Sequence, residues 1–456
     1  SVDMVKPITD VPDTQQLLSQ IVSDRALFER VLDASSPTDS KGRYLHWEEV
    51  RHRKPPNGLT TEQYWLSLKL GRRLQKLSPV LLDKQNRPFV LSTPDMVLRH
   101  LHEVDKRGPR DLLFDNMGDT RRQGRLRMLI RPHVEEAIQS SLLEGASATR
   151  AQAKQLLDSG RAPETRAERM VWNNLQANEF VQQVKDENLT PAHILELHRI
   201  VADRTLANPD DAGRWRLSDD VVIVDPSGSE QVIHVPPKAN SLPGRIEQIC
   251  AFANRDLSNK PFIHPVIHAI LLHFMIGYDH PFVDGNGRTA RGLFFWAMAR
   301  AGYWLTEYLA ISRIIRQAPA KYTRAYLYTE TDDNDTTYFI LHQLSVLLRA
   351  YSDLEIYMQR KLGELDDTIA QLEDSQLLSQ LNERQVAVLS HALKNPEARY
   401  RIRKHQEDRN VTYQTARTDL LNLAKFGLLS QTRVGRSFVF IAPRNLLERI
   451  KSAQFN

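Results

Sequence analysis

Apolar side chains recur at helical spacing through most of the chain. Pro132 suits a helix start. Apolar residues follow it at helical spacing, at Val134, Ile138 and Leu142. A mostly apolar series predicts a buried helix from about residue 265 to 276, and a further helix is expected from 292 to 300. Residues 1–115 combine helical and mixed segments that Pro and Gly interrupt. This pattern predicts a mainly α-helical protein.

One segment has the composition of strands instead. Residues 221–224 (VVIV) and 231–235 (QVIHV) are rich in β-branched side chains, and the intervening DPSGS at 225–229 is typical of a turn. Two consecutive prolines, Pro236 and Pro237, end the second run. The segment is therefore expected to form a β-hairpin.

The C-terminal part changes pattern again. Residues 351–380 are polar apart from an apolar seam at Leu362, Leu365, Ile369 and Leu372, which predicts a connecting helix or a short coiled coil. Beyond it, helices are expected at 386–392 and 411–421, Gly427 ends the second helix, and 434–440 suits a small hairpin. Two helices followed by a hairpin is the order of a winged helix-turn-helix.

The length of 456 residues exceeds what one hydrophobic core usually serves, so several domains are expected. We expect an N-terminal helical or mixed region at 1–115, a central helical domain at 116–350, a helical linker at 351–380 and a winged helix-turn-helix at 381–456.

The expected winged helix has two candidate partners. If it binds DNA, the side chains that would face the bases are Tyr413, Gln414 and Arg417, and Arg433 and Arg436 in the wing would lie near phosphates. A winged helix can equally serve protein contacts or dimerisation. The sequence leaves both partners open.

Composition limits the class of protein. Apolar residues make up 41% and charged residues 26%, as in globular proteins, and no apolar run is long enough to cross a bilayer, so no membrane contact is expected. The net charge of +5 permits nucleotide or nucleic-acid partners without requiring them. The single cysteine, Cys250, excludes an intrachain disulfide and fits a reducing compartment, so we expect a cytoplasmic protein.

The segment 280–291, HPFVDGNGRTAR, gathers groups that suit a polyphosphate. Gly285 and Gly287 let the backbone approach an anion and point N–H groups at it. The helix that follows adds its positive N-terminal end. Arg288 and Arg291 lie three residues apart, so both guanidinium groups project from the first turn of that helix.

Two further side chains add reactive chemistry to this segment. Asp284 offers a hard oxygen ligand for Mg²⁺ between phosphates. His280 is a candidate base because imidazole titrates near neutral pH. A base, a metal carboxylate and a phosphate cradle together predict phosphoryl or nucleotidyl transfer from a nucleotide.

The segment resembles the signature of the Fic family, His-x-Phe-x-Asp/Glu-Gly-Asn-Gly-Arg-x-x-Arg, and every fixed position is filled. The resemblance extends from about residue 130 to 345 and implies a Fic-type helical core. It also implies a protein adenylyltransferase (AMPylator), in which the histidine deprotonates a Ser, Thr or Tyr hydroxyl that then attacks the α-phosphate of ATP.

Roles within the segment follow from the same resemblance. His280 is then the general base, and Asp284 holds Mg²⁺ or Mn²⁺. The phosphates are bound by Gly285, Asn286 and Gly287, and the β/γ end is clamped by Arg288 and Arg291. Relatives that phosphorylate carry lysine in place of the second glycine, so Gly287 implies that AMP is the group moved.

Residues outside the loop also resemble the family pattern. The expected hairpin at 221–235 corresponds to a flap that holds an extended segment of the target protein by β-augmentation. The hairpin residues that would line the nucleotide site are Gln231, Val232, Ile233 and His234. On the adenine side, the resemblance points to Tyr322 and Asn334.

The run SSLLEG at 140–145 resembles the family's inhibitory motif, Ser/Thr-x-x-x-Glu-Gly/Asn, in the class with an N-terminal inhibitory helix. That helix is expected here at about 132–146. Glu144 would pair with Arg291 and occupy the γ-phosphate position, and Ser140 would help to place the helix. Relatives with this helix often self-associate, so a homo-oligomer is expected.

Two other functions stay open. The chain could be a DNA-binding regulator that uses the Fic core as a nucleotide sensor, or a deAMPylase in which Glu144 orients water to remove AMP from a protein. The intact His280 favours an enzyme over a sensor, because a sensor needs the phosphate cradle but not the base.

Overall fold

The computed structural model describes residues 8–108, 133–159, 161–224, 232–256, 258–374, 377–434 and 437–452. The described residues form two compact units. The first unit contains those within 8–108, 136–148 and 163–350, and the second those within 133–135, 149–162 and 351–452. Helices dominate both units, as the apolar spacing predicts.

The first unit begins with the helices α1 (Thr14–Ile21), α2 (Arg25–Asp33), α3 (Trp47–Val50), α4 (Thr61–Arg73) and α5 (Asp95–Arg107). It continues with α8 (Val134–Leu143), most of which belongs to this unit, α10 (Arg166–Gln183), α11 (Pro191–Ala202) and the strands β1 (Ile223–Val224) and β2 (Val232–His234). The helices that follow are α12 (Leu242–Ala253), α13 (Pro265–Asp279), α14 (Asn286–Arg300), α15 (Ile311–Gln317), α16 (Pro319–Thr331) and the first part of α17 (Thr337–Asp374). Short 3₁₀ turns lie at Pro209–Asp211, Ala239–Ser241 and Trp304–Tyr308.

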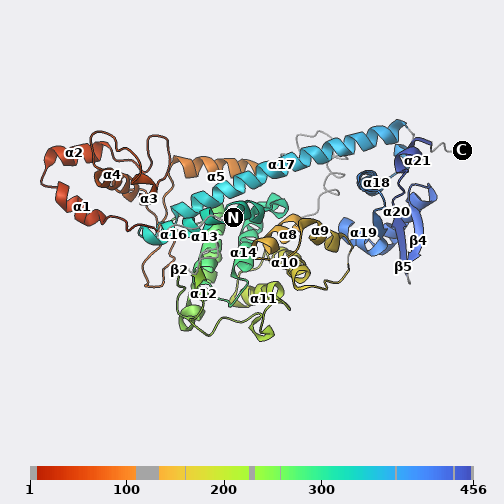
Figure 1. The fold of residues 1–456 in the computed structure, drawn as a ribbon, viewed down its shortest axis with the longest axis horizontal. Coiled ribbons are helices and arrows are strands. Elements are labelled where there is room, and N and C mark those ends of the chain that lie inside the picture. The colour runs from red at the N-terminus through yellow and green to blue at the C-terminus, as the bar shows by residue number, and fades with distance from the viewer. Residues whose placement is uncertain are drawn as a thin grey trace. The chain divides into compact units, whose positions relative to one another are not determined.

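Helices α13 and α14 lie side by side in this unit (Figure 1). Twelve of the 15 residues of each helix are buried, and α13 requires such surroundings because it is apolar on nearly all sides. The start of α14 differs from the expected residue 292, since the helix begins at Asn286. The glycine and arginine positions of the 280–291 segment therefore lie at the helix start itself. No described helix combines the length and apolar character needed to cross a membrane.

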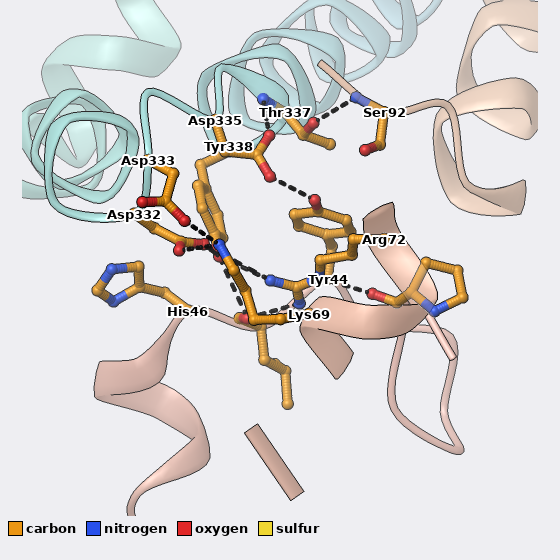
Figure 2. Close-up of polar contacts among 12 residues, drawn as sticks. Tyr44, His46, Lys69, Arg72, Ser92, Asp332, Asp333, Asp335, Thr337 and Tyr338 are labelled. Carbon is orange, nitrogen blue, oxygen red and sulfur yellow. Dashed lines mark hydrogen bonds and ion pairs between the residues drawn. The ribbon is translucent and has the colours of Figure 1, made fainter. Parts of the chain in front are cut away.

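The N-terminal helices attach to the rest of the unit through buried charges. The side chains of Lys69 and Arg72 on α4 point toward the turn between α16 and α17, where Asp332 is located (Figure 2). Arg72 is fully buried; its Nη1 donates to the Tyr338 hydroxyl at 2.9 Å, and its Nη2 donates to the Leu45 carbonyl at 2.8 Å. Lys69 forms an ion pair with Asp332, which also accepts a bond of 2.8 Å from the Tyr338 hydroxyl.

We expect an Arg72→Met variant to lose about 3–5 kcal/mol in free energy of unfolding, because the change leaves buried Asp332 without part of its compensating charge. Urea unfolding followed by far-UV circular dichroism measures this loss. Arg25→Met is the matched control, since the Arg25 side chain is 92% exposed and its pair with Glu29 should contribute below about 1 kcal/mol. A loss below about 1 kcal/mol in Arg72→Met would contradict this role.

The second unit contains α9 (Arg150–Ser159), the end of α17, a 3₁₀ turn at Leu378–Gln380, α18 (Glu383–Lys394), β3 (Arg399–Arg401), α19 (Ile402–Arg409), α20 (Tyr413–Lys425), β4 (Ser430–Val434), β5 (Ser437–Ile441) and α21 (Leu446–Ser452). Its sheet has the antiparallel order β3-β5-β4. Leu365 and Leu372, from the apolar seam expected at 351–380, are buried in the core of this unit together with Leu389 and Leu420. The seam therefore packs against residues of its own unit.

Candidate active site

A loop at 280–285 joins the two buried helices α13 and α14. Helix α13 ends at Asp279, His280 adopts a left-handed conformation with φ 44°, and Gly285 at φ 85° precedes α14. The Asn286 side chain closes the loop, because its Oδ1 accepts from the Phe282 N–H at 2.9 Å and its Nδ2 donates to the Phe282 carbonyl at 2.8 Å. The side-chain amide of Asn286 thus shapes the loop, which leaves only the backbone of Asn286 for the phosphate contact expected of this residue.

The His280 ring is oriented by the end of its own helix. Its Nδ1 lies 3.3 Å from the Gly277 carbonyl oxygen, which can only accept a hydrogen bond, so the neutral ring carries its proton on Nδ1. The lone pair of Nε2 is then free to take a proton. Burial lowers the pKa of His280 to about 4, so the ring is neutral at pH 7 and able to act as a base.

Arg216 fixes the backbone around His280. Its Nε donates to the His280 carbonyl at 2.9 Å, and its Nη2 donates to the carbonyl of Pro237, just after β2. The backbone N–H of Arg216 also donates to the Pro281 carbonyl at 2.9 Å. This buried guanidinium ties the base of the β1–β2 hairpin to the loop that holds the histidine.

Arg288 is available to an anion. It is buried, and its Nη1 donates to the Val201 carbonyl at 3.1 Å. Its Nε and Nη2 have no hydrogen-bond acceptor among the described residues, although Nη2 lies 3.6 Å from an oxygen of Asp284. Burial lowers the pKa of Arg288, and a phosphate would supply both the missing acceptors and a compensating charge.

Asp284 is the carboxylate expected to hold a metal. Its side chain is 46% exposed, its Oδ1 accepts from the Gly285 N–H at 2.6 Å, and its Oδ2 lies 3.8 Å from Arg166. No group of three His, Cys, Asp or Glu side chains suited to a metal occurs in the described part of the chain. Asp284 alone could hold a Mg²⁺ ion only if a nucleotide and water supplied the remaining oxygen ligands.

His198 supports Asp284 from beneath the loop, a role that the sequence did not reveal. Its Nε2 bonds to the Asp284 carbonyl at 2.8 Å, its Nδ1 accepts from the Gly213 N–H at 3.0 Å, and its ring stacks on Phe282. Burial lowers the pKa of His198 to about 4, so the ring is neutral at pH 7, and its two partners place the proton on Nε2. In the sequence His198 is only one position of a helical apolar stripe, so no local signal distinguishes it.

Helix α8 brings Glu144 and Ser140 to Arg291. The Glu144 Oε1 lies 2.7 Å from the Arg291 Nη2, and the Ser140 hydroxyl accepts from both Nε and Nη2 of Arg291, at 3.0 and 2.9 Å. Burial by itself would lower the pKa of Arg291. The negative charges of Glu144 and Glu136 have the larger effect, so the pKa of Arg291 is raised. A Cβ at Gly287 would overlap the Glu144 carboxylate, so this glycine makes room for the pair.

The spacing of the SSLLEG run has a structural reason. Ser140 and Glu144 are four residues apart and share one face of the helix. Gly145 has φ 84°; its N–H donates to the Leu142 carbonyl and the Ala146 N–H donates to the Ser141 carbonyl, which together form a Schellman motif. The glycine thus ends α8 directly after Glu144.

Three further contacts hold α8 on its neighbours. The Glu136 carboxylate accepts from the N–H and hydroxyl of Ser312, at 3.0 and 2.5 Å. Gln139 accepts from Arg316 at 3.0 Å, and the Ser141 hydroxyl accepts from Asn174 at 2.8 Å. Helix α8 is therefore anchored at several points besides Arg291.

The strands expected at 221–224 and 231–235 are present in shorter form, as the antiparallel pair β1 and β2. Gln231 lies outside the described residues. Val232 is 48% exposed and Ile233 is half-buried. His234 is buried, with its Nδ1 3.0 Å from Glu330 and its Nε2 2.8 Å from the Tyr278 carbonyl, so both ring nitrogens already have partners.

Tyr322 lies in the first turn of α16 and Asn334 in the turn between α16 and α17, and the two residues bond to different partners. The Tyr322 hydroxyl is 2.9 Å from Nε2 of the buried His273 on α13. The Asn334 amide donates to Asp83 at 2.9 Å, and the Asp83 carbonyl accepts from Arg245, whose guanidinium pairs with Asp279. Asn334 therefore reaches the residue before His280 through a chain of contacts.

Residues 188–298 match the family model described as Fic/DOC family. The chain is 41% identical to protein adenylyltransferase Fic of Nematostella vectensis over 120 residues. This alignment covers 26% of the chain and 25% of that protein. The chain is 27% identical over 283 residues to the protein of the same name from Drosophila yakuba, which covers 61% of this chain and 52% of that protein. A Fic family protein from Desulfovibrio desulfuricans matches in structure with a TM-score of 0.46 and 19% identity, over 76% of this chain and 96% of that one.

The part of the chain that matches the Fic/DOC family, residues 188–298, thus includes α13, the 280–291 segment and most of α14. The chain spans 25% of the length of the Nematostella vectensis protein and 52% of the length of the Drosophila yakuba protein.

Proposed function

We propose that this protein transfers AMP from ATP to a Ser, Thr or Tyr hydroxyl of a target protein. The observation that carries the proposal is the neutral His280, with Nε2 free, at the end of a loop whose next residues form an anion cradle with Arg288. The names of the curated relatives, protein adenylyltransferase Fic, support the same reaction. Gly287 supports AMP rather than phosphate as the group moved, through the family resemblance.

In the proposed reaction the hydroxyl oxygen attacks the α-phosphorus, and a new O–P bond forms while the bond from the α-phosphorus to the bridging oxygen breaks. Pyrophosphate leaves, and the hydroxyl proton passes to His280 Nε2. Arg288 and the backbone at Gly285 and Gly287 bind the phosphates. A Mg²⁺ ion held by Asp284 would neutralise charge on the phosphate oxygens.

We further propose that the protein is autoinhibited. The carboxylate of Glu144 engages Arg291, the guanidinium expected to bind the γ-phosphate, so ATP must displace it to bind productively. The β1–β2 hairpin would serve as the flap that holds an extended segment of the target, since Val224 and Val232 on it are about half exposed.

Parallel reactions with α-³²P- and γ-³²P-labelled ATP test the group moved, with automodification of the full chain as the readout. We expect label on protein only from the α position, together with release of labelled pyrophosphate from γ-labelled ATP. Label from the γ position would overturn AMP transfer in favour of phosphorylation. The His280→Ala variant is the control for label that binds without reaction.

A further inference from the structure

Positive charge is concentrated at the C-terminal end of the chain. Residues 377–456 contain 14 Lys and Arg against 6 Asp and Glu, a net charge of +8, while the whole chain has +5. The preceding 376 residues therefore have a net charge of −3. A basic region on an otherwise slightly acidic protein indicates a polyanionic partner for that region.

The second unit presents two packed helices followed by a hairpin. Helices α19 and α20 contact each other and are joined by a turn in which Asn410 has φ 48°. Strands β4 and β5 then form an antiparallel hairpin whose turn, 435–436, lies outside the described residues. In winged helix-turn-helix proteins the second helix of such a pair enters the major groove and the hairpin contacts the backbone.

The outer face of α20 suits a nucleic acid. Its inward residues are apolar apart from Asp419. The half-buried and exposed polar residues of α20 are Tyr413, Gln414, Thr415, Arg417, Thr418, Asn422 and Lys425. All of α20 is described, and this face holds no carboxylate, whereas every one of these side chains can donate a hydrogen bond to a base edge or a phosphate.

The one carboxylate of α20 is turned inward. Asp419 is buried and accepts from Asn382 at 2.8 Å, from Arg384 at 2.6 and 3.0 Å, and lies 3.1 Å from His405. Burial alone would raise the pKa of Asp419, but these hydrogen bonds lower it strongly, so the carboxylate stays ionised. The network joins α18, α19 and α20 and fixes the direction in which the outer face of α20 points.

Several basic residues of the second unit are not neutralised by neighbours. In the part of the chain that the structure describes, Arg401, Arg403, Arg417, Lys425 and Arg433 form no ion pair with a carboxylate. Arg384 and Arg444, by contrast, pair with Asp419 and Glu397. Duplex DNA carries one negative charge per ~1.7 Å of its axis, so it can compensate several such cations at once.

We propose that the second unit binds duplex DNA, with α20 in the major groove and the β4–β5 hairpin against the adjacent phosphates. Arg417 contacts bases or phosphates from α20, and Arg433 contacts the backbone from β4. No residue of the 280–291 loop takes part, so this binding is independent of the proposed AMP transfer.

Fluorescence anisotropy of a labelled 30-base-pair duplex of mixed sequence, titrated with the full-length protein at 50–200 mM NaCl, tests the proposal. We expect micromolar binding at the lowest salt, weakening with a slope of about −0.9 per phosphate contact in a plot of log K against log salt. Arg417→Ala and Arg433→Ala should each weaken binding about 5- to 10-fold and reduce the slope by about one contact. Gln414→Glu, an exposed change that cannot disturb the core, should weaken it similarly by repulsion.

Arg444→Ala is the matched control, because it removes the same charge from the same unit at a residue paired with Glu397. It should change binding less than twofold, and His280→Ala should not change it. Absence of binding at 50 mM NaCl, or equal weakening by Arg444→Ala, would overturn the proposal. A third result would also overturn it: no DNA binding by the wild type, together with a lower oligomeric mass of Gln414→Glu than of the wild type in light scattering. That result would assign the outer face of α20 to a contact between copies of this chain.

Discussion

A His280→Ala variant is expected to transfer AMP about 10³-fold more slowly than the wild type at saturating MgATP, because the change removes the base that we propose accepts the hydroxyl proton. The ring is placed for this role by the αL turn after α13, by the Gly277 carbonyl on Nδ1 and by Arg216 on its backbone carbonyl. Automodification with α-labelled ATP measures the rate. His52→Ala, an exposed histidine in the same unit, should leave it unchanged.

The pH dependence separates a base in this environment from an ordinary histidine. Burial lowers the pKa of His280 to about 4, so the proton that would block the base binds only below that pH. The wild-type rate should therefore change less than about twofold between pH 7.5 and 5.5, and fall only as the pH drops through about 4. A base with an unshifted pKa of ~6.5 would lose about tenfold by pH 5.5, and such a loss would contradict the environment described for His280.

Elements with strong apolar periodicity were predictable, and elements without it were not. Helix α13 was expected because its apolar residues are nearly continuous, and the hairpin β1–β2 because turn residues separate two β-branched runs. Helix α19, with the sequence IRKHQEDR, was missed, since only Ile402 and His405 are buried and the rest is polar. Helix α14 begins at Asn286 and not at residue 292, in agreement with the expectation that Arg288 and Arg291 lie in its first turn; Gly287 lowers the helix propensity of this turn, while the Thr289 hydroxyl donates to the Gly285 carbonyl at 2.9 Å.

In the candidate site, too, some residues were predictable from the sequence and others were not. Within 280–291 the groups are close in sequence, so their proximity follows from the motif. Arg216 and His198 support that loop from 64 and 86 residues away, and no spacing rule connects residues so distant in sequence. The attachment of α4 to the turn at 332–338 is equally non-local, and a buried Lys69 or Arg72 reads in the sequence as an ordinary surface charge.

A Glu144→Gly variant is expected to transfer AMP about 10- to 100-fold faster than the wild type, which corresponds to ~1.4–2.7 kcal/mol of relieved coupling. The change removes the carboxylate 2.7 Å from Arg291 Nη2 and frees that guanidinium for a phosphate. Helix α8 should stay in place, because Glu136, Gln139 and Ser141 keep their own partners. Automodification with α-labelled ATP, and the KM for ATP, measure the gain.

Two variants separate charge from packing in this effect. Glu187→Gly is the matched control, since Glu187 is also a turn residue just after a helix but is 64% exposed and remote in sequence from the motif; it should leave the rate unchanged. Ser140→Ala removes the hydroxyl that accepts from Arg291 but keeps the carboxylate, so it should raise the rate less than Glu144→Gly does.

If Glu144→Gly transfers AMP no faster than the wild type, ATP displaces the carboxylate without cost. The Glu144–Arg291 pair would then be a structural contact between α8 and α14 and not a brake.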